Sequence, residues 1–250
     1  MMFRSVVFFC FILFQCFIQK VSYCQVSAVS ANEGEALKNA RSVYERSLGE
    51  QSGIYRGPGY IGYPYPITNG HPFFESPEHT KGTIFYDGML YKDIPIWYDL
   101  IKDQVVIQYV DGFSKISLHT EKIDYFSLYN HLFINIKKDT SNTSFLSAGF
   151  YDRVYQGKTE VLVKRSKGSL KDATTQGIFI KILKQKNDFY IKKGGKYYTV
   201  ESAGSVLKAL GSKQKEIQEF LKKSNIKFRK DPENTIIRMV RYYDQLTELK

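Results

Sequence analysis

Apolar and polar residues alternate along the chain between positions 83 and 200, in short runs bounded by Gly, Asp or Asn. Such alternation, rich in β-branched and aromatic residues, is typical of strands with one buried face. Asp87-Gly88 predicts a type I′-like hairpin turn. The other connections are also short, so neighbouring strands should be antiparallel. The predicted strands cover residues 83–86, 89–91, 94–99, 105–110, 115–119, 123–129, 131–137, 149–155, 160–165, 177–184, 188–192 and 196–200.

The pattern changes to a helical period on both sides of this region. Residues 32–48 predict a first helix, because Asn32 and Glu35 have the spacing of a capping box. After residue 200, Ser205 to Leu210 predicts a short helix, and Ile217, Phe220 and Leu221 form the apolar stripe of another. Asp231 followed by Pro232 predicts the start of a final helix. Its apolar face holds Ile236, Met239, Val240, Tyr243 and Leu246.

Together these patterns predict an α+β fold that is mainly β. Its centre is an antiparallel β-meander over residues 81–200, curled or closed like a barrel because wide flat sheets are unstable. An N-terminal helix and a Pro/Gly/Tyr-rich loop occupy residues 25–80. Two to three C-terminal helices in residues 201–250 should pack on the β-domain.

Residues 1–24 have the pattern of an export signal. Arg4 precedes an apolar run from Val6 to Ile18, and small or short residues, Ser22 and Cys24, stand before Gln25. The run is shorter than the roughly 20 residues that span a bilayer. A retained membrane anchor and a lipid on Cys24 are the two alternatives. After removal of the signal we expect no transmembrane span and an exported protein, periplasmic or surface-associated.

The three cysteines, Cys10, Cys16 and Cys24, all lie in this leader. A mature chain that starts at Gln25 therefore has no disulfide, no thiol nucleophile and no cysteine-type zinc site. The hydrolase motifs G-x-S-x-G and H-E-x-x-H are also missing from the sequence. His71 and His79 lie near two glutamates, but their spacing fits no metal motif. We therefore expect no metal, no cofactor and no identifiable catalytic residue.

The charge is unevenly distributed along the chain. Positions 25–130 hold 9 basic and 13 acidic residues, whereas positions 131–250 hold 25 basic and 12 acidic residues. An excess of this size indicates either a solvated surface or an anionic partner such as an envelope polymer. An exported protein rarely meets nucleic acid, so nucleic acid is not expected as a partner. The residues predicted to meet an anionic partner are Lys164, Arg165, Lys167, Lys213, Lys215, Lys222 and Lys223.

The loop from Gly53 to Phe74 combines glycine, proline and tyrosine. Five of the seven prolines fall between positions 58 and 77, which excludes a regular helix or a central strand there. Its aromatic rings could present flat surfaces to a sugar or an extended peptide, or they could cover one end of the sheet. The candidate ligand-binding residues are Tyr55, Arg56, Tyr60, Tyr63 and Tyr65.

Five parts of the sequence carry a family resemblance. They are Ile94-Pro95-Ile96-Trp97-Tyr98-Asp99 with the hairpin before it, Asp103-Gln104-Val105-Val106, the segment from Lys213 to Phe228, the Tyr242-Tyr243 end, and the leader that ends before Gln25. The chain resembles small exported proteins of Bacteroidota that have no assigned activity. The resemblance implies an exported β-rich protein and says nothing of its chemistry.

These observations favour a non-catalytic exported protein that binds a ligand or an envelope partner. The alternative is a hydrolase of envelope or scavenged polymers that works through carboxylates the sequence does not single out. A deep cleft with two facing carboxylates would favour the hydrolase, and an open aromatic or basic surface would favour binding.

Overall fold

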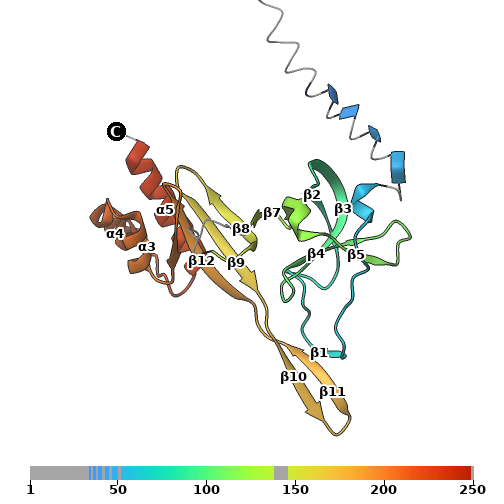
Figure 1. The fold of residues 1–250 in the computed structure, drawn as a ribbon. Coiled ribbons are helices and arrows are strands. Elements are labelled where there is room, and N and C mark those ends of the chain that lie inside the picture. Colours follow the sequence, from blue (N-terminus) through green and yellow to red (C-terminus); the bar gives the residue numbers. More distant parts are fainter. Residues whose placement is uncertain are drawn as a thin grey trace, which may run out of the picture. The chain divides into compact units, whose positions relative to one another are not determined.

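The computed structural model describes residues 52–137 and 146–248, together with part of residues 34–49 (Figure 1). The chain divides into two units, residues 1–49 and residues 50–250, and all elements named below belong to the second. The predicted signal peptide lies outside the described residues, and so does much of the predicted helix over residues 32–48. Both stay predictions.

The described part of residues 50–250 is mainly β, with three helices at its C-terminal end, as the sequence predicted. The first strands are β1 (Ile67–Asn69), β2 (Thr80–Tyr86), β3 (Met89–Asp99), β4 (Gln104–Gln108), β5 (Lys115–Ser117), β6 (Ile123–Leu128) and β7 (His131–Ile136). They are followed by β8 (Gly149–Gln156), β9 (Glu160–Ser166), β10 (Ser169–Thr174), β11 (Gly177–Ile182), β12 (Lys186–Lys193) and β13 (Lys196–Val200). The helices are α3 (Ala203–Leu210), α4 (Gln214–Lys223) and α5 (Pro232–Glu248).

Ten of these strands form one antiparallel sheet in the order β13-β12-β9-β8-β7-β6-β2-β3-β4-β5. Within the described residues this sheet is open, with β13 and β5 at its edges, so the barrel-like form of the prediction is wrong. The order also departs from a simple meander, because β2 lies between β3 and β6. Gly82 permits this pairing, since a Cβ there would collide with the backbone carbonyl of Ser127 on β6.

One turn and one hairpin show where local sequence signals succeed and fail. Asp87 and Gly88 both have positive φ, as a type I′ turn requires, so that prediction is confirmed. The segment over residues 177–184 does form a strand, but β11 pairs with β10 and β1 in a separate three-stranded sheet. Strand β10 was not predicted. All six of its residues are exposed, so no buried face imposes an alternating pattern on them.

The side chains of β2 to β7 form one hydrophobic cluster, called here the N-terminal cluster. Aromatic rings dominate it, since Phe126 and Phe133 stack at 4.9 Å and Tyr98 contacts both of them edge-on. Phe74, from the chain before β2, contacts Phe133 edge-on at 5.2 Å. The segment before β2 is therefore part of this core.

The three helices and strands β9, β12 and β13 bury a second cluster, called here the C-terminal cluster. Val161, Ile191 and Val200 supply its sheet side. On α5 the buried residues Ile236, Met239, Val240 and Tyr243 confirm the predicted apolar face. Helix α3 begins with a capping box between Ser202 and Ser205, which satisfies donors at the start of a short helix. Helices α3 and α5 thus cover the sheet where these strands run (Figure 1).

Candidate functional site

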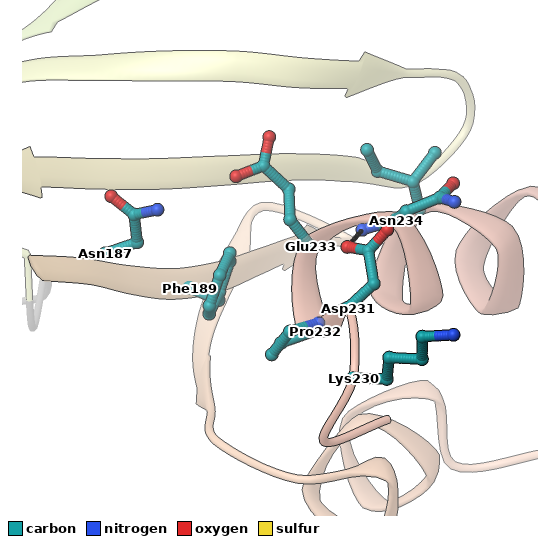
Figure 2. Close-up of a pocket in the computed structure, with 8 residues that line it drawn as sticks. Asn187, Phe189, Lys230, Asp231, Pro232, Glu233 and Asn234 are labelled. Carbon is teal, nitrogen blue, oxygen red and sulfur yellow. Dashed lines mark hydrogen bonds between the residues drawn. The ribbon is translucent and has the colours of Figure 1, made fainter. Parts of the chain in front are cut away.

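An open pocket of about 560 Å³ lies where the start of α5 meets β12 (Figure 2). We call it the α5 pocket. Its lining consists of Asn187, Phe189, Lys230, Asp231, Pro232, Glu233, Asn234 and Ile237. The volume falls within the range of ordinary small-molecule sites, but most of these side chains are polar. Figure 2 shows the Phe189 ring between Asn187 and Pro232, with Asp231 and Asn234 on the α5 side.

Local sequence signals place the helical side of the pocket. The Oδ1 atom of Asp231 accepts from the backbone N–H of Asn234 at 3.1 Å, and Pro232 is the first helical residue. The Thr235 hydroxyl donates to the carbonyl of Asp231 at 2.6 Å. These bonds pair polar groups at the first turn of α5, and the turn places Glu233 and Asn234 beside the pocket.

A buried arginine, Arg165 on β9, holds the carboxylate of Glu233. Its Nη1 donates to Oε2 at 3.0 Å and its Nη2 donates to Oε1 at 2.9 Å, which is the bidentate geometry of a strong pair. The same guanidinium donates to Oδ2 of Asp152 on β8, from Nε at 2.8 Å and from Nη2 at 2.5 Å. Burial acts to lower the pKa of Arg165, but the two carboxylates raise it above its usual value.

Asp152 is the most enclosed member of this network. It is 1% exposed, and its Oδ2 also contacts Nδ1 of His131 at 2.6 Å. Its Oδ1 atom has no hydrogen-bond partner among the described residues. Removing Arg165 would leave a buried carboxylate with little compensation, which costs about 3–5 kcal/mol in comparable cases. The network therefore holds Glu233, which lines the pocket, in one position.

Asn187 on β12 is a second polar group that Arg165 positions. With its amide oriented to satisfy both of its atoms, the oxygen of Asn187 faces Nη1 of Arg165 at 3.3 Å. Phe189, two residues along the same strand, lies on the same face and packs partly against the C-terminal cluster. One buried side chain thus orients polar groups from both walls of the pocket.

Two tyrosines of the tyrosine-rich loop, Tyr60 and Tyr63, bind a buried carboxylate. Asp99, which is fully buried, accepts from the hydroxyl of Tyr60 at 2.8 Å and from that of Tyr63 at 2.7 and 2.9 Å. Burial, with the charge and hydrogen bond of Asp99, raises the pKa of both tyrosines well above the usual range. The Nζ atom of Lys102 lies 4.9 and 4.8 Å from the two ring centroids and donates to the carbonyl of Gly62 at 2.9 Å. The loop is therefore fastened to the β3–β4 turn.

The other three candidates of this loop have contacts of their own. Tyr55 contacts the Tyr109 ring edge-on at 5.7 Å and packs on the N-terminal cluster. Arg56 is exposed, and its backbone N–H donates to the carbonyl of Gly53 at 3.3 Å. Tyr65 lies under Nζ of Lys171 at 5.5 Å. Tyr60 and Tyr63 thus share Asp99, whereas Tyr55 and Tyr65 contact the different residues named above, and a ligand surface on this loop stays a prediction.

Of the predicted basic residues, the three on and after β9 make internal contacts. Lys164 forms an ion pair with Asp103 at 2.5 Å, and Arg165 is only 5% exposed. Lys167 donates to the carbonyls of His71 at 3.1 Å and Phe73 at 2.6 Å, and burial lowers its pKa. The prediction took Arg165 for a surface residue, but carboxylates on two other elements hold it inside.

The remaining predicted basic residues belong to α4 and the residue before it. Lys215, Lys222 and Lys223 are exposed, while Lys213 is half-buried and pairs with Glu216 at 3.1 Å. These four do not lie among the lining residues of the α5 pocket. They stay a predicted surface for an anionic partner.

Sequence reasoning missed the residues that form the α5 pocket. It found Asp231 and Pro232 as a helix start, but no local signal relates them to Asn187 and Phe189 on β12. The pairing of Arg165 with Glu233 spans 68 positions. A cationic residue inside a strand of buried apolar neighbours, Val161 to Val163, is the one signal that could have suggested a buried pair.

No family model, curated protein or solved structure matches this chain. Among the described residues there is no group of three or more His, Cys, Asp or Glu side chains that could hold a metal ion. In the same part of the chain, no helix has both the length and the apolar character needed to cross a bilayer.

Proposed function

We propose that this chain is a non-catalytic exported binding protein, periplasmic or at the cell surface, and that it binds its ligand in the α5 pocket. The leader pattern of residues 1–24 supports export. An open pocket lined by polar groups and one aromatic ring supports binding.

The observation that carries the proposal is the fixed position of Glu233. Both of its carboxylate oxygens accept from Arg165, and Arg165 is itself held by Asp152 underneath. A binding group that is ordered before the ligand arrives saves the entropy that its ordering would otherwise cost on binding. The pocket therefore has the rigid base that a binding site needs.

The same contacts favour binding over hydrolysis. A carboxylate pair that cleaves a glycosidic bond needs one group free to donate a proton and one free to attack or to activate water. In the α5 pocket Glu233 is engaged with a guanidinium on both oxygens, and Asp231 caps the helix. Both act as hydrogen-bond acceptors that shape the pocket.

An anionic envelope polymer or an envelope protein is the partner class that the charge distribution favours. Lys215, Lys222 and Lys223 on α4 are exposed and could contribute a weak, salt-dependent attraction. This attraction would bring the protein close to the envelope, whereas the pocket would give selectivity.

The test is retention of the protein on a purified envelope fraction of the producing cells. Asn234→Trp fills the α5 pocket from an exposed position and should lower retention at least tenfold. Gln245→Trp is the matched control, because it is exposed on the same helix roughly 16 Å further along. Equal retention of the two variants would contradict ligand binding in the α5 pocket. An uncleaved chain confined to the cytoplasm would contradict export.

A further inference from the structure

We propose that the α5 pocket selects a neutral saccharide, an inference that rests on the proposed function. The lining holds two carboxylates, Asp231 and Glu233, and one basic residue, Lys230. The charge of Glu233 is partly offset by Arg165, which it shares with the buried Asp152. An anionic ligand would therefore meet more acidic than basic side chains, whereas a neutral, hydroxyl-rich ligand can use the carboxylates as hydrogen-bond acceptors.

The hydrogen-bonding groups of the pocket are planar and come from two elements. The carboxamides of Asn187 and Asn234 each offer a donor and an acceptor on one plane, and the carboxylates of Asp231 and Glu233 offer paired acceptors. Adjacent hydroxyl groups of a sugar ring can each donate to one atom of such a group and accept from another. In Figure 2 the side chains of Asn187 and Asn234 lie on opposite sides of the Phe189 ring.

The Phe189 ring supplies the apolar part of the site. One face of a pyranose ring carries mainly C–H groups, and a flat aromatic face is complementary to it in shape and polarity. Phe189 is partly exposed at the pocket and is held from behind by the C-terminal cluster. A ring fixed in this way, with polar groups around its edge, can bind a sugar without reorganising.

Arg165 acts here as a positioning residue. It contacts Glu233 and lies under Asn187, but it is only 5% exposed and does not line the pocket. Its effect is to fix the direction of two acceptors, which restricts the hydroxyl geometries that the pocket accepts.

The experiment is titration of the full mature chain with a panel of neutral oligosaccharides built from hexoses and N-acetylhexosamines. Uronic-acid and sulfated oligosaccharides form the second arm, and both arms are repeated at 0.1 and 1 M NaCl. At least one neutral oligosaccharide should bind, and its affinity should change less than twofold between the two salt concentrations, because no ion pair with the ligand is formed.

Three variants locate the site. Phe189→Leu keeps an apolar side chain but removes the flat face, so affinity should fall at least tenfold. Phe189→Tyr restores the ring and should stay within threefold of the wild type, and Asn234→Ala should weaken binding about fivefold, as expected for one lost hydrogen bond. Melting temperatures of the variants control for folding.

Two results would contradict the proposal that the α5 pocket binds a neutral saccharide. One is binding confined to the anionic oligosaccharides and lost at 1 M salt, which would move recognition to the basic residues. The other is no binding in either arm. If retention on the envelope fraction still depended on Asn234 in that second case, the proposed function would stand and only the ligand class would fall.

Discussion

A single buried carboxylate, Asp99, organises the tyrosine-rich loop. Besides the hydroxyls of Tyr60 and Tyr63, its Oδ1 accepts from the backbone N–H groups of Ile101 at 2.9 Å and Lys102 at 3.0 Å. The bonds satisfy a charge that would be costly to bury alone. They also join two segments that lie 36 and 39 positions apart.

The stability of the protein should therefore fall as the pH rises above about 10, the usual pKa of tyrosine. In the folded state Tyr60 and Tyr63 keep their protons because their pKa values are raised, whereas the unfolded chain releases them. The unfolded state then binds fewer protons, so the free energy of unfolding decreases with pH. The double variant Tyr60→Phe/Tyr63→Phe should be less stable than the wild type at pH 8. This deficit should shrink by about 2 kcal/mol between pH 10 and pH 11, because each of the two tyrosines contributes about 1 kcal/mol over that interval. Urea denaturation at pH 8, 9, 10 and 11 measures it, and a constant deficit would contradict the assigned role.

Residue identity alone gave a misleading picture of the segment Lys164-Arg165-Ser166-Lys167. Such a run is usually a solvated face, and nothing in it distinguishes Arg165 from its neighbours. Its partners Asp152 and Glu233 lie 13 and 68 positions away. Only the tertiary structure brings them together. The Asp87-Gly88 turn was predictable because its geometry depends on its own two residues.

Helix α5 is fastened to the sheet near its C-terminal end as well as at its start. The Oδ2 atom of Asp244 accepts from the backbone N–H of Thr159 at 3.0 Å and from the hydroxyl of Tyr155 at 3.1 Å. Gly157, in the turn between β8 and β9, leaves room for this contact, because a Cβ there would meet Asp244 Oδ2 at 2.5 Å. The turn and the helix are thus complementary in shape.

Asp244→Ala should lower the free energy of unfolding by about 1–3 kcal/mol, because it leaves the buried N–H of Thr159 without an acceptor. Asp244→Asn keeps an oxygen in place and should cost less. The neighbouring Gln245 is exposed, so Gln245→Ala serves as the control and should stay within about 0.5 kcal/mol of the wild type. Denaturant titration of the three variants measures their free energies of unfolding. Equal stability of Asp244→Ala and Gln245→Ala would contradict the role of Asp244 in fastening α5 to the β8–β9 turn.

The start and the buried face of α5 could be read from the sequence, since Asp231, Pro232 and the 3.6-residue period are local signals. Strand β10 could not, because a strand exposed on both faces has no period to detect. The pairing of β2 with β6 depends on a long-range backbone approach at Gly82. The α5 pocket depends on two elements that meet only in the folded chain.

At the scale of residues 50–250, two hydrophobic clusters share one sheet. The pairing of β7 with β8 continues the sheet from one cluster to the other. Arg165 links them as well, because its guanidinium lies 5.7 Å from the centroid of the Phe74 ring and also holds Glu233 on α5. Phe74 belongs to the N-terminal cluster, whereas α5 belongs to the C-terminal one.

The two clusters should therefore unfold together in one cooperative transition. Trp97, the single tryptophan, is 6% exposed and lies on β3, so its fluorescence reports the unfolding of the β2–β7 region. Ellipticity at 222 nm reports mainly α3, α4 and α5. In urea the two signals should give the same midpoint, as coincident probes do for a two-state unit.

Arg165→Met should lower both midpoints together. The free energy of unfolding should fall by about 3–5 kcal/mol, because the substitution leaves Asp152 and Glu233 without their shared partner. The exposed Arg229→Met is the control for loss of charge alone. Separate midpoints in the wild type would show that the clusters are independent domains, in which case Arg165 could not be the link that holds them as one.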